Sequence, residues 1–160
     1  MHTTGPGEAL DGDAEEAADR AMLATAAQLL GLGNQVLDMA VDYAKARRQF
    51  GKAIGSFQAV QHHLVDALLK LKFAAPVVYR AAHSVATKDP HRALHVSMAK
   101  IYAGEAAELA CKKSLQVHGA IGYTFEYDLH LWMKRCWALS AAWGSPAWHR
   151  DQAATFVLGE

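Results

Sequence analysis

The stretch DAEEAADRAMLATAAQLLGLGNQVLDMAVDYAKARRQFGK, residues 13–52, predicts one long amphipathic helix together with both of its ends. Asp13 can cap the helix because its carboxylate accepts backbone N–H groups, and Glu15 and Glu16 suit the positive end of the helix dipole. We expect it to stop within residues 47–52, where Gly51 and then Gly55 permit backbone conformations that other residues resist. Apolar and small side chains at alternating steps of four and three share one face, namely Met22, Ala26, Leu29, Gly33, Val36, Ala40 and Tyr43. We expect this face to pack against other helices.

Further helices follow along the chain. Ser56 is the expected cap of a second helix, which Pro76 should kink because proline lacks a backbone N–H. Its apolar stripe is Val60, Leu64, Leu68 and Leu71. Asp89-Pro90 is typical of a helix start and Gly119 of a helix end, so a third helix is expected between them. Its buried face should begin with Leu94, Met98 and Ile101.

The last helices are expected at about 127–143 and 146–158, separated by Gly144-Ser145-Pro146. No segment indicates a strand. The sequence therefore predicts an all-α domain over residues 13–160, an up-and-down bundle of four to five helices, preceded by a flexible tail or linker remnant at residues 1–12.

Composition limits the functions that such a bundle can have. The 160 residues include 16 basic and 16 acidic side chains, so no net field favours nucleic acid or an anionic membrane. Cys111 and Cys136 match no metal-binding or disulfide pattern. No apolar stretch reaches the roughly 20 residues that span a bilayer, and no signal peptide is evident. We expect a soluble, cytoplasmic protein.

Three segments resemble the C-terminal domain of acyl-CoA dehydrogenases. The first is YAKARRQFGKAI (residues 43–54) followed by FQAVQ (57–61), which is similar to the helix-loop-helix of that domain. The second, QVHGAIGYT (116–124), is similar to the family's Q-x-x-G-G-x-G-Y-T turn, with Ala120 in place of the second glycine. The third is EYDLHL (126–131), with Lys134-Arg135 after it. The resemblance extends from about residue 13 to the end of the chain.

The resemblance implies a part of an FAD-dependent enzyme that dehydrogenates acyl-CoA thioesters. In such enzymes this bundle contacts the adenosine and pyrophosphate half of an FAD held mainly by a neighbouring subunit, in a homo- or hetero-oligomer, and electron-transfer flavoprotein is the implied electron acceptor. Arg47 matches the arginine that binds the pyrophosphate, as paired guanidinium donors would. The other implied FAD-binding residues are Gln49, Phe50, Ile54, Phe57, Gln58, Gln116, Gly119 and Ala120.

The catalytic base of the family is missing at both positions where members carry it. Gly144 stands where the usual glutamate lies, and Ala21 and Met22 stand at the alternative position on the first helix. Asp19 lies half a turn away and faces elsewhere, and Glu126 and Asp128 suit solvated or helix-terminal roles. We therefore assign no catalytic residue, expect the isolated chain to be inactive, and compare it with base-lacking subunits of heteromeric members.

Metal binding fits the sequence less well, whereas two alternatives related to the same family stay open. His91 and His95 lie four apart on one helix face, but no third ligand is placed to complete a metal site, and no glutamate has the histidine three positions later that a di-iron bundle uses. A non-catalytic interaction module derived from the family, or part of a related acyl-CoA oxidase or flavin monooxygenase, stays an alternative. Four tryptophans in the last helices, Trp132, Trp137, Trp143 and Trp148, suit core or oligomer packing.

Overall fold

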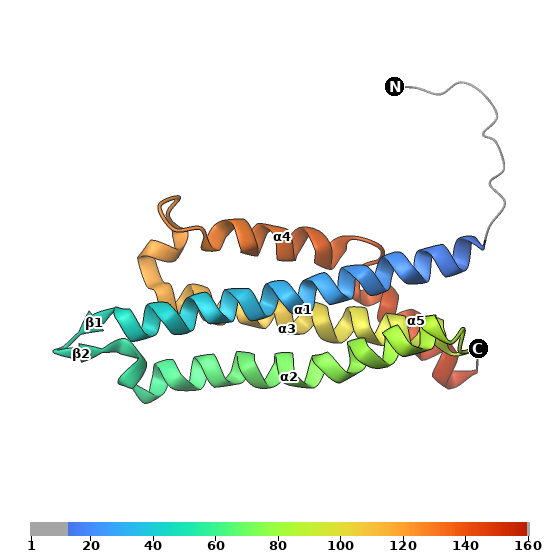
Figure 1. The fold of residues 1–160 in the computed structure, drawn as a ribbon, viewed down its shortest axis with the longest axis horizontal. Coiled ribbons are helices and arrows are strands. Elements are labelled where there is room, and N and C mark those ends of the chain that lie inside the picture. Colours follow the sequence, from blue (N-terminus) through green and yellow to red (C-terminus); the bar gives the residue numbers. More distant parts are fainter. Residues whose placement is uncertain (1–12, 160) are drawn as a thin grey trace, which may run out of the picture.

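The computed structural model describes residues 13–159, so the expected tail at residues 1–12 lies outside the described part. Its elements in chain order are α1 (Ala14–Ala46), β1 (Arg48–Gln49), β2 (Lys52–Ala53), the 3₁₀ turn η1 (Ile54–Ser56), α2 (Gln58–Ala86), α3 (Arg92–His118), the 3₁₀ turn η2 (Gly119–Tyr123), α4 (Leu129–Ala141) and α5 (Pro146–Leu158). Three long helices, α1 to α3, lie side by side, and α3 packs against all the other helices (Figure 1). The predicted all-α bundle is confirmed, with one small hairpin, β1–β2, that the sequence reading did not foresee.

The predicted starts and ends hold where a local capping group decides them. The Asp13 carboxylate accepts the backbone N–H groups of Glu15 and Glu16, each at 3.0 Å. Gly119 ends α3 with φ +63°, in the left-handed region that favours glycine. Ser145 caps α5, whose first residue is Pro146 as predicted.

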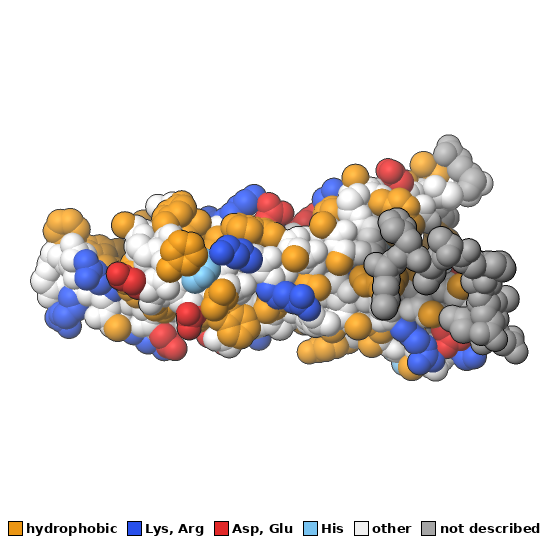
Figure 2. All heavy atoms as spheres, turned by 90° about the horizontal axis from the view of Figure 1, so that it is seen from above, with side chains coloured by type: hydrophobic (Ala, Val, Ile, Leu, Met, Phe, Trp, Pro, Cys, Tyr) orange, Lys and Arg blue, Asp and Glu red, His pale blue; other side chains and the backbone are white. Residues whose placement is uncertain are grey.

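The outer surface mixes apolar and charged side chains. Figure 2 shows the face that carries α4, where hydrophobic side chains are spread among lysines and arginines. Leu131 and Trp137 on α4 are exposed, as are Phe73 and Tyr79 on α2. No helix within residues 13–159 has the length and apolar character needed to cross a membrane.

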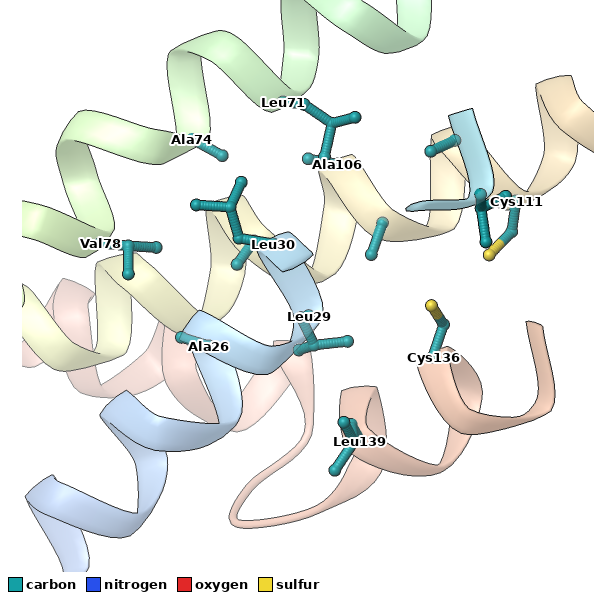
Figure 3. Close-up of a cluster of buried hydrophobic side chains, with 14 of the residues drawn as sticks. Ala26, Leu29, Leu30, Leu71, Ala74, Val78, Ala106, Cys111, Cys136 and Leu139 are labelled. Carbon is teal, nitrogen blue, oxygen red and sulfur yellow. The ribbon is translucent and has the colours of Figure 1, made fainter. Parts of the chain in front are cut away.

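The core combines many alanines with leucine, valine, cysteine and methionine side chains where α1, α2, α3 and α4 meet (Figure 3). The predicted face of α1 is confirmed, since Ala26, Leu29 and Val36 are fully buried. At Gly33 an added Cβ would lie 2.7 Å from Leu71 Cδ2 and 3.2 Å from the Ala107 backbone, so the absence of a side chain lets three helices meet.

Cys111 on α3 and Cys136 on α4 are both buried, with their side chains directed toward one another (Figure 3). A hydrogen bond to the Cys136 sulfur and burial raise the pKa of the Cys111 thiol. Both cysteines are free, as the sequence reading assumed.

Two predictions about α2 are wrong. Ser56 does not cap it, because its hydroxyl donates to the Ala53 carbonyl at 2.8 Å inside η1, and α2 begins at Gln58 without a side-chain cap. Leu68 is exposed, because at that turn of α2 the preceding residue, Ala67, faces the core. The buried stripe continues through Leu71, Ala74, Val78 and Ala81. Pro76 lies inside α2 without ending it.

Three other boundaries or faces differ from expectation. The Asp89 carboxylate accepts the His91 N–H at 2.8 Å in a turn, so α3 begins at Arg92, two residues after Pro90. The core face of α3 is that of Val96, Ala99 and Ala103, whereas Leu94, Met98 and Ile101 are only half-buried. Finally, α4 is shorter than residues 127–143, since Trp143 and Gly144 have positive φ angles of 59° and 106°.

Candidate cofactor-binding site

The motif after α1 folds as a tight hairpin. Arg48 pairs with Ala53 and Gln49 with Lys52, which leaves Phe50 and Gly51 as the two turn residues with φ angles of 52° and 80°. A positive φ is unfavourable for a bulky residue, and such backbone strain gathers at functional sites. The Phe50 side chain is 90% exposed at this turn. The hairpin thus presents an aromatic ring outward from the end of the bundle.

Arg47 is fixed through its backbone while its side chain is exposed. Its N–H donates to the Tyr43 carbonyl and its own carbonyl accepts the Ile54 N–H, both at 2.8 Å. Its guanidinium forms no ion pair with any of residues 13–159, whereas the Arg48 guanidinium donates to the Gly51 carbonyl at 3.2 Å. Neither arginine has a carboxylate partner among the described residues, but only the Arg48 guanidinium is hydrogen-bonded within the hairpin, so the Arg47 guanidinium is the one whose donors the described residues leave unused.

The remaining residues of the motif lie on the same hairpin and at the start of α2. The Gln49 amide donates to the Arg48 carbonyl at 2.8 Å. The Phe57 ring lies edge-on to Phe50 at 6.2 Å, with the Lys52 ammonium 4.4 Å above it. Ile54 is half-buried at the base of the hairpin, and Gln58 is the exposed first residue of α2.

The second motif forms the turn after α3. Gln116, Gly119 and Ala120 are all exposed, and an added Cβ on Gly119 would find open space within 4 Å. Gly122 differs, because its added Cβ would lie 2.9 Å from Leu115 Cδ1. Gly122 thus serves packing, whereas Gly119 leaves backbone open to approach from outside.

Both motifs lie at the same end of the bundle (Figure 1). A small apolar cluster joins them, since Val117 of α3 packs with Ala40 and Ala44 of α1, and Ile54 packs against this cluster. The resemblance assigns the arginine loop and the glycine turn to the same cofactor, and in the fold these two segments lie at the same end of the bundle.

His118 belongs to this end of the bundle and is buried between aromatic rings. Its ring stacks on Tyr43 at 4.5 Å and lies 4.7 Å from Tyr127. Nδ1 donates to the Ser114 carbonyl at 2.7 Å, because a carbonyl can only accept, and burial lowers the pKa of the imidazole. Nε2 has no hydrogen-bond partner among the described residues. His118 therefore packs as a neutral ring.

Gly144, which the resemblance matches to the family's usual base, lies near Met22, the residue after the expected alternative position Ala21, toward the start of α1 and away from the hairpin. An open groove of about 400 Å³ is lined by Ala18, Met22, Trp143, Gly144, Ser145 and Trp148. None of these described lining residues is an acid or a base. A Cβ on Gly144 would lie 2.6 Å from Trp148 Cε3 and 2.9 Å from His149 Nε2, so a longer side chain does not fit without rearrangement.

The nearby carboxylates have other partners or positions. Asp19 lines a neighbouring groove of about 680 Å³, where its buried Oδ2 accepts from Arg92 Nε at 2.8 Å. Glu126 and Asp128 are exposed after the glycine turn. Asp19 thus takes part in a structural ion pair that the sequence reading did not identify.

Histidines do not assemble into a ligand set within residues 13–159, where no group of three or more His, Cys, Asp or Glu side chains is close enough to hold a metal. The His91 and His95 rings are 6.5 Å apart, and His95 Nδ1 is hydrogen-bonded to Ser84 Oγ at 2.8 Å.

Comparisons with known proteins agree with this geometry. The family model for the acyl-CoA dehydrogenase C-terminal domain matches residues 13–158. The chain is 37% identical over 135 residues to acyl-CoA dehydrogenase IpdE2 of Mycolicibacterium smegmatis, covering 84% of this chain and 42% of that relative. It is also 39% identical over 118 residues to the caffeyl-CoA reductase-Etf complex subunit CarC of Acetobacterium woodii, covering 74% of this chain and 31% of CarC.

Among solved structures, the glutaryl-coenzyme A dehydrogenase complex with glutaryl-CoA matches with a TM-score of 0.83 and 31% identity, over 90% of this chain and 36% of that one. The ChsE4-ChsE5 complex from Mycobacterium tuberculosis matches with a TM-score of 0.83 and 27% identity, over 89% of this chain and 39% of that one. The chain thus spans less than half the length of each of these relatives. It belongs to the acyl-CoA dehydrogenase family, and the part of the family that it contains is the C-terminal helical domain.

Proposed function

We propose that this chain supplies a surface for the nucleotide half of an FAD held mainly by a neighbouring subunit, in an assembly that dehydrogenates acyl-CoA thioesters between the α and β carbons. The observation that carries the proposal is the meeting of the arginine hairpin and the glycine turn at one end of the bundle.

The residues at this end fit a dinucleotide in chemical terms. The Arg47 guanidinium offers paired donors for pyrophosphate oxygens, and its charge has no ion-pair partner among the described residues. Gly119 leaves its backbone open to phosphate. Phe50, Ile54 and Phe57 would form an apolar wall. When bound, FAD supplies the acceptor for the hydride that leaves the substrate.

The exposed amides would complete the binding surface. Gln116, Gln49 and Gln58 lie on the two motifs and can each both donate and accept hydrogen bonds. Ala120 departs from the family's glycine, but it is exposed in η2. Its methyl group therefore need not displace the turn, and we keep it among the cofactor contacts.

We also propose that the catalytic base comes from another chain. The groove at Met22 and Gly144 is lined by no carboxylate among the described residues, and Trp148 occupies the space beside Gly144. Met22 and Ala46 are 24 residues apart on α1, which corresponds to roughly 36 Å along the helix. Such a separation supports two sites per chain, with the hairpin serving a neighbour.

An assembly also suits the surface of the chain. Phe50, Phe73 and Tyr79 are large apolar side chains that are mostly exposed. The partner is a subunit of the same family in this proposal, acyl-CoA is its substrate, and electron-transfer flavoprotein is its electron acceptor.

The test compares Arg47→Ala with the matched control Arg48→Ala in the assembly with a partner subunit. Arg48 is also exposed, but its guanidinium is bonded within the hairpin. We expect Arg47→Ala to weaken FAD retention roughly tenfold or more, since a charge-assisted hydrogen bond contributes about 1.5–3 kcal/mol. Arg48→Ala should retain FAD like the parent.

Flavin absorbance per subunit after gel filtration measures retention, and circular dichroism checks that helical content is unchanged. Equal flavin occupancy in the parent and in Arg47→Ala would refute the cofactor role. A parent chain that binds no flavin with any family partner would instead favour the non-catalytic interaction module.

A further inference from the structure

The loop between α4 and α5 has a strained shape. Trp143 and Gly144 are consecutive residues with φ angles of 59° and 106°. A left-handed conformation is unfavourable for a residue with a side chain, so it persists only where surrounding contacts fix it. Trp143 and Gly144 also line the groove that contains Met22. The contacts that fix the loop therefore determine the shape of that groove.

Lys100 provides the first set of contacts. It lies on α3 and is only 3% exposed. Its ammonium donates to the Leu139 carbonyl at 2.9 Å and to the Ala142 carbonyl at 2.8 Å, at the carboxyl end of α4. A cation at this end of a helix interacts favourably with the helix dipole and with carbonyls that lack an intrahelical partner. No carboxylate among residues 13–159 forms an ion pair with Lys100.

His149 of α5 provides the second set. Its Nε2 lies 3.1 Å from the Trp143 carbonyl and must donate to it, because a carbonyl only accepts. Nδ1 is then the acceptor for the Ser97 hydroxyl on α3, at 3.2 Å. The ring is buried, and burial together with the positive charge of Lys100 lowers the pKa of His149. A neutral ring in a single tautomer follows.

These contacts converge on one short segment. The carbonyls of Leu139, Ala142 and Trp143 are all held by side chains of α3 and α5, which come from parts of the chain on both sides of α4. Lys100 and Ser97 lie three residues apart on α3 and therefore share a face. The loop is thus held by side chains of both α3 and α5.

We infer that Lys100 and His149 are positioning residues that hold the α4–α5 loop in its strained shape, so that Trp143 and Gly144 form a rigid wall of the groove beside Met22. The use of this wall in an acyl-CoA dehydrogenase assembly rests on the proposed function. The positioning itself does not, and it can be measured in the chain without flavin or substrate. If the chain proves not to bind FAD, the positioning role of Lys100 and His149 is unaffected. If Lys100 and His149 prove not to hold the loop, the proposed FAD contacts are unaffected.

The test compares Lys100→Met with the control Lys112→Met by hydrogen exchange and mass spectrometry. Methionine is unbranched and can replace the aliphatic part of the lysine side chain, but it has no charge and no donor. Lys112 is on the same helix but is exposed and pairs only with Glu108, at 2.6 Å. We expect peptides covering residues 139–147 to exchange at least tenfold faster in Lys100→Met, with the middle of α1 unchanged, and no difference in Lys112→Met. Equal loop exchange in a folded Lys100→Met chain would overturn the inference.

The first step of a spectroscopic test uses the unmodified chain and so does not depend on a variant that could misfold. Nitrogen-15 NMR of the unmodified chain near neutral pH should show His149 neutral with the proton on Nε2. An imidazolium, or a proton on Nδ1, would contradict the arrangement. In Lys100→Met the titration midpoint of His149 should rise, because the nearby charge is gone, and it should stay unchanged in Lys112→Met. The same midpoint in all three proteins would show that Lys100 and His149 do not act together.

Discussion

Raising the pH should stabilise the fold through Lys100. Burial lowers the pKa of its ammonium from 10.5 to about 8. Between these two values the unfolded chain keeps the proton and the folded chain releases it. Unfolding then takes up a proton, so the free energy of unfolding rises with pH across this window. Below about pH 8 both states are protonated and the penalty of the buried charge is present in full.

The size of the effect follows from the two pKa values. Their difference, 10.5 minus about 8, is about 2.5 units, and each unit corresponds to 1.36 kcal/mol, so the whole window is worth about 3 kcal/mol. Between about pH 7 and about pH 10 we expect a gain of about 2–3 kcal/mol. Other groups act oppositely here: the hydrogen bond to Cys136 and burial raise the pKa of Cys111, burial raises the pKa of Tyr127, and the unfolded chain therefore ionises both first.

The assay therefore measures a difference between two proteins. Urea unfolding followed by circular dichroism gives the free energy of unfolding of the parent and of Lys100→Met at each pH. The thiols and tyrosines are common to both, so their contributions cancel. The parent should gain stability relative to Lys100→Met as pH rises. Parallel curves over the whole range would mean that Lys100 titrates normally, and the account of an uncompensated buried ammonium would be wrong.

Three substitutions test other parts of the structure. Gly33→Ala should lower the free energy of unfolding by about 1–3 kcal/mol, because the new methyl group would lie 2.7 Å from Leu71 Cδ2, and an unchanged urea midpoint would contradict this. Asp19→Asn should cost about 2–3 kcal/mol by leaving Arg92 without its closest carboxylate, and the double variant Asp19→Asn with Arg92→Met should lose less than the sum of the single losses. Gly144→Glu should cost about 1–3 kcal/mol, because φ there is +106°, and a melting temperature equal to that of the parent would show that the loop can accept a side chain.

Features decided by neighbouring residues in the sequence could be predicted. Asp13 caps α1 through its own carboxylate, Gly119 ends α3 through its own backbone freedom, and Pro146 starts α5 through its fixed φ. Ser56 shows the limit of such reasoning. As a cap, its hydroxyl would accept a backbone N–H of α2. In the structure it instead donates to the Ala53 carbonyl in the 3₁₀ turn before α2.

Features that depend on distant segments could not be predicted in the same way. Lys100 lies among the apolar and small residues Val96, Ala99 and Ala103, and this placement was the available signal that it is buried. Its acceptors are 39 and 42 residues away, however, and their positions depend on how α4 docks. The Asp19–Arg92 pair is similar, since 73 residues separate its members. For the cofactor site, the resemblance placed the motifs together, while the roles of their individual side chains stay predictions.

The two ends of the bundle differ in what they retain, and this difference supports a division of labour between chains. At the hairpin end, Arg47 and Gly119 keep a cation and an open turn accessible. At the other end, Gly144 has a φ angle of +106°, and Trp148 and His149 occupy the space where a side chain would begin. A carboxylate-bearing residue there would require Trp148 and His149 to shift. A groove fixed in this way suits a subunit whose partner contributes the base, since proton abstraction needs that group within hydrogen-bond reach of the substrate.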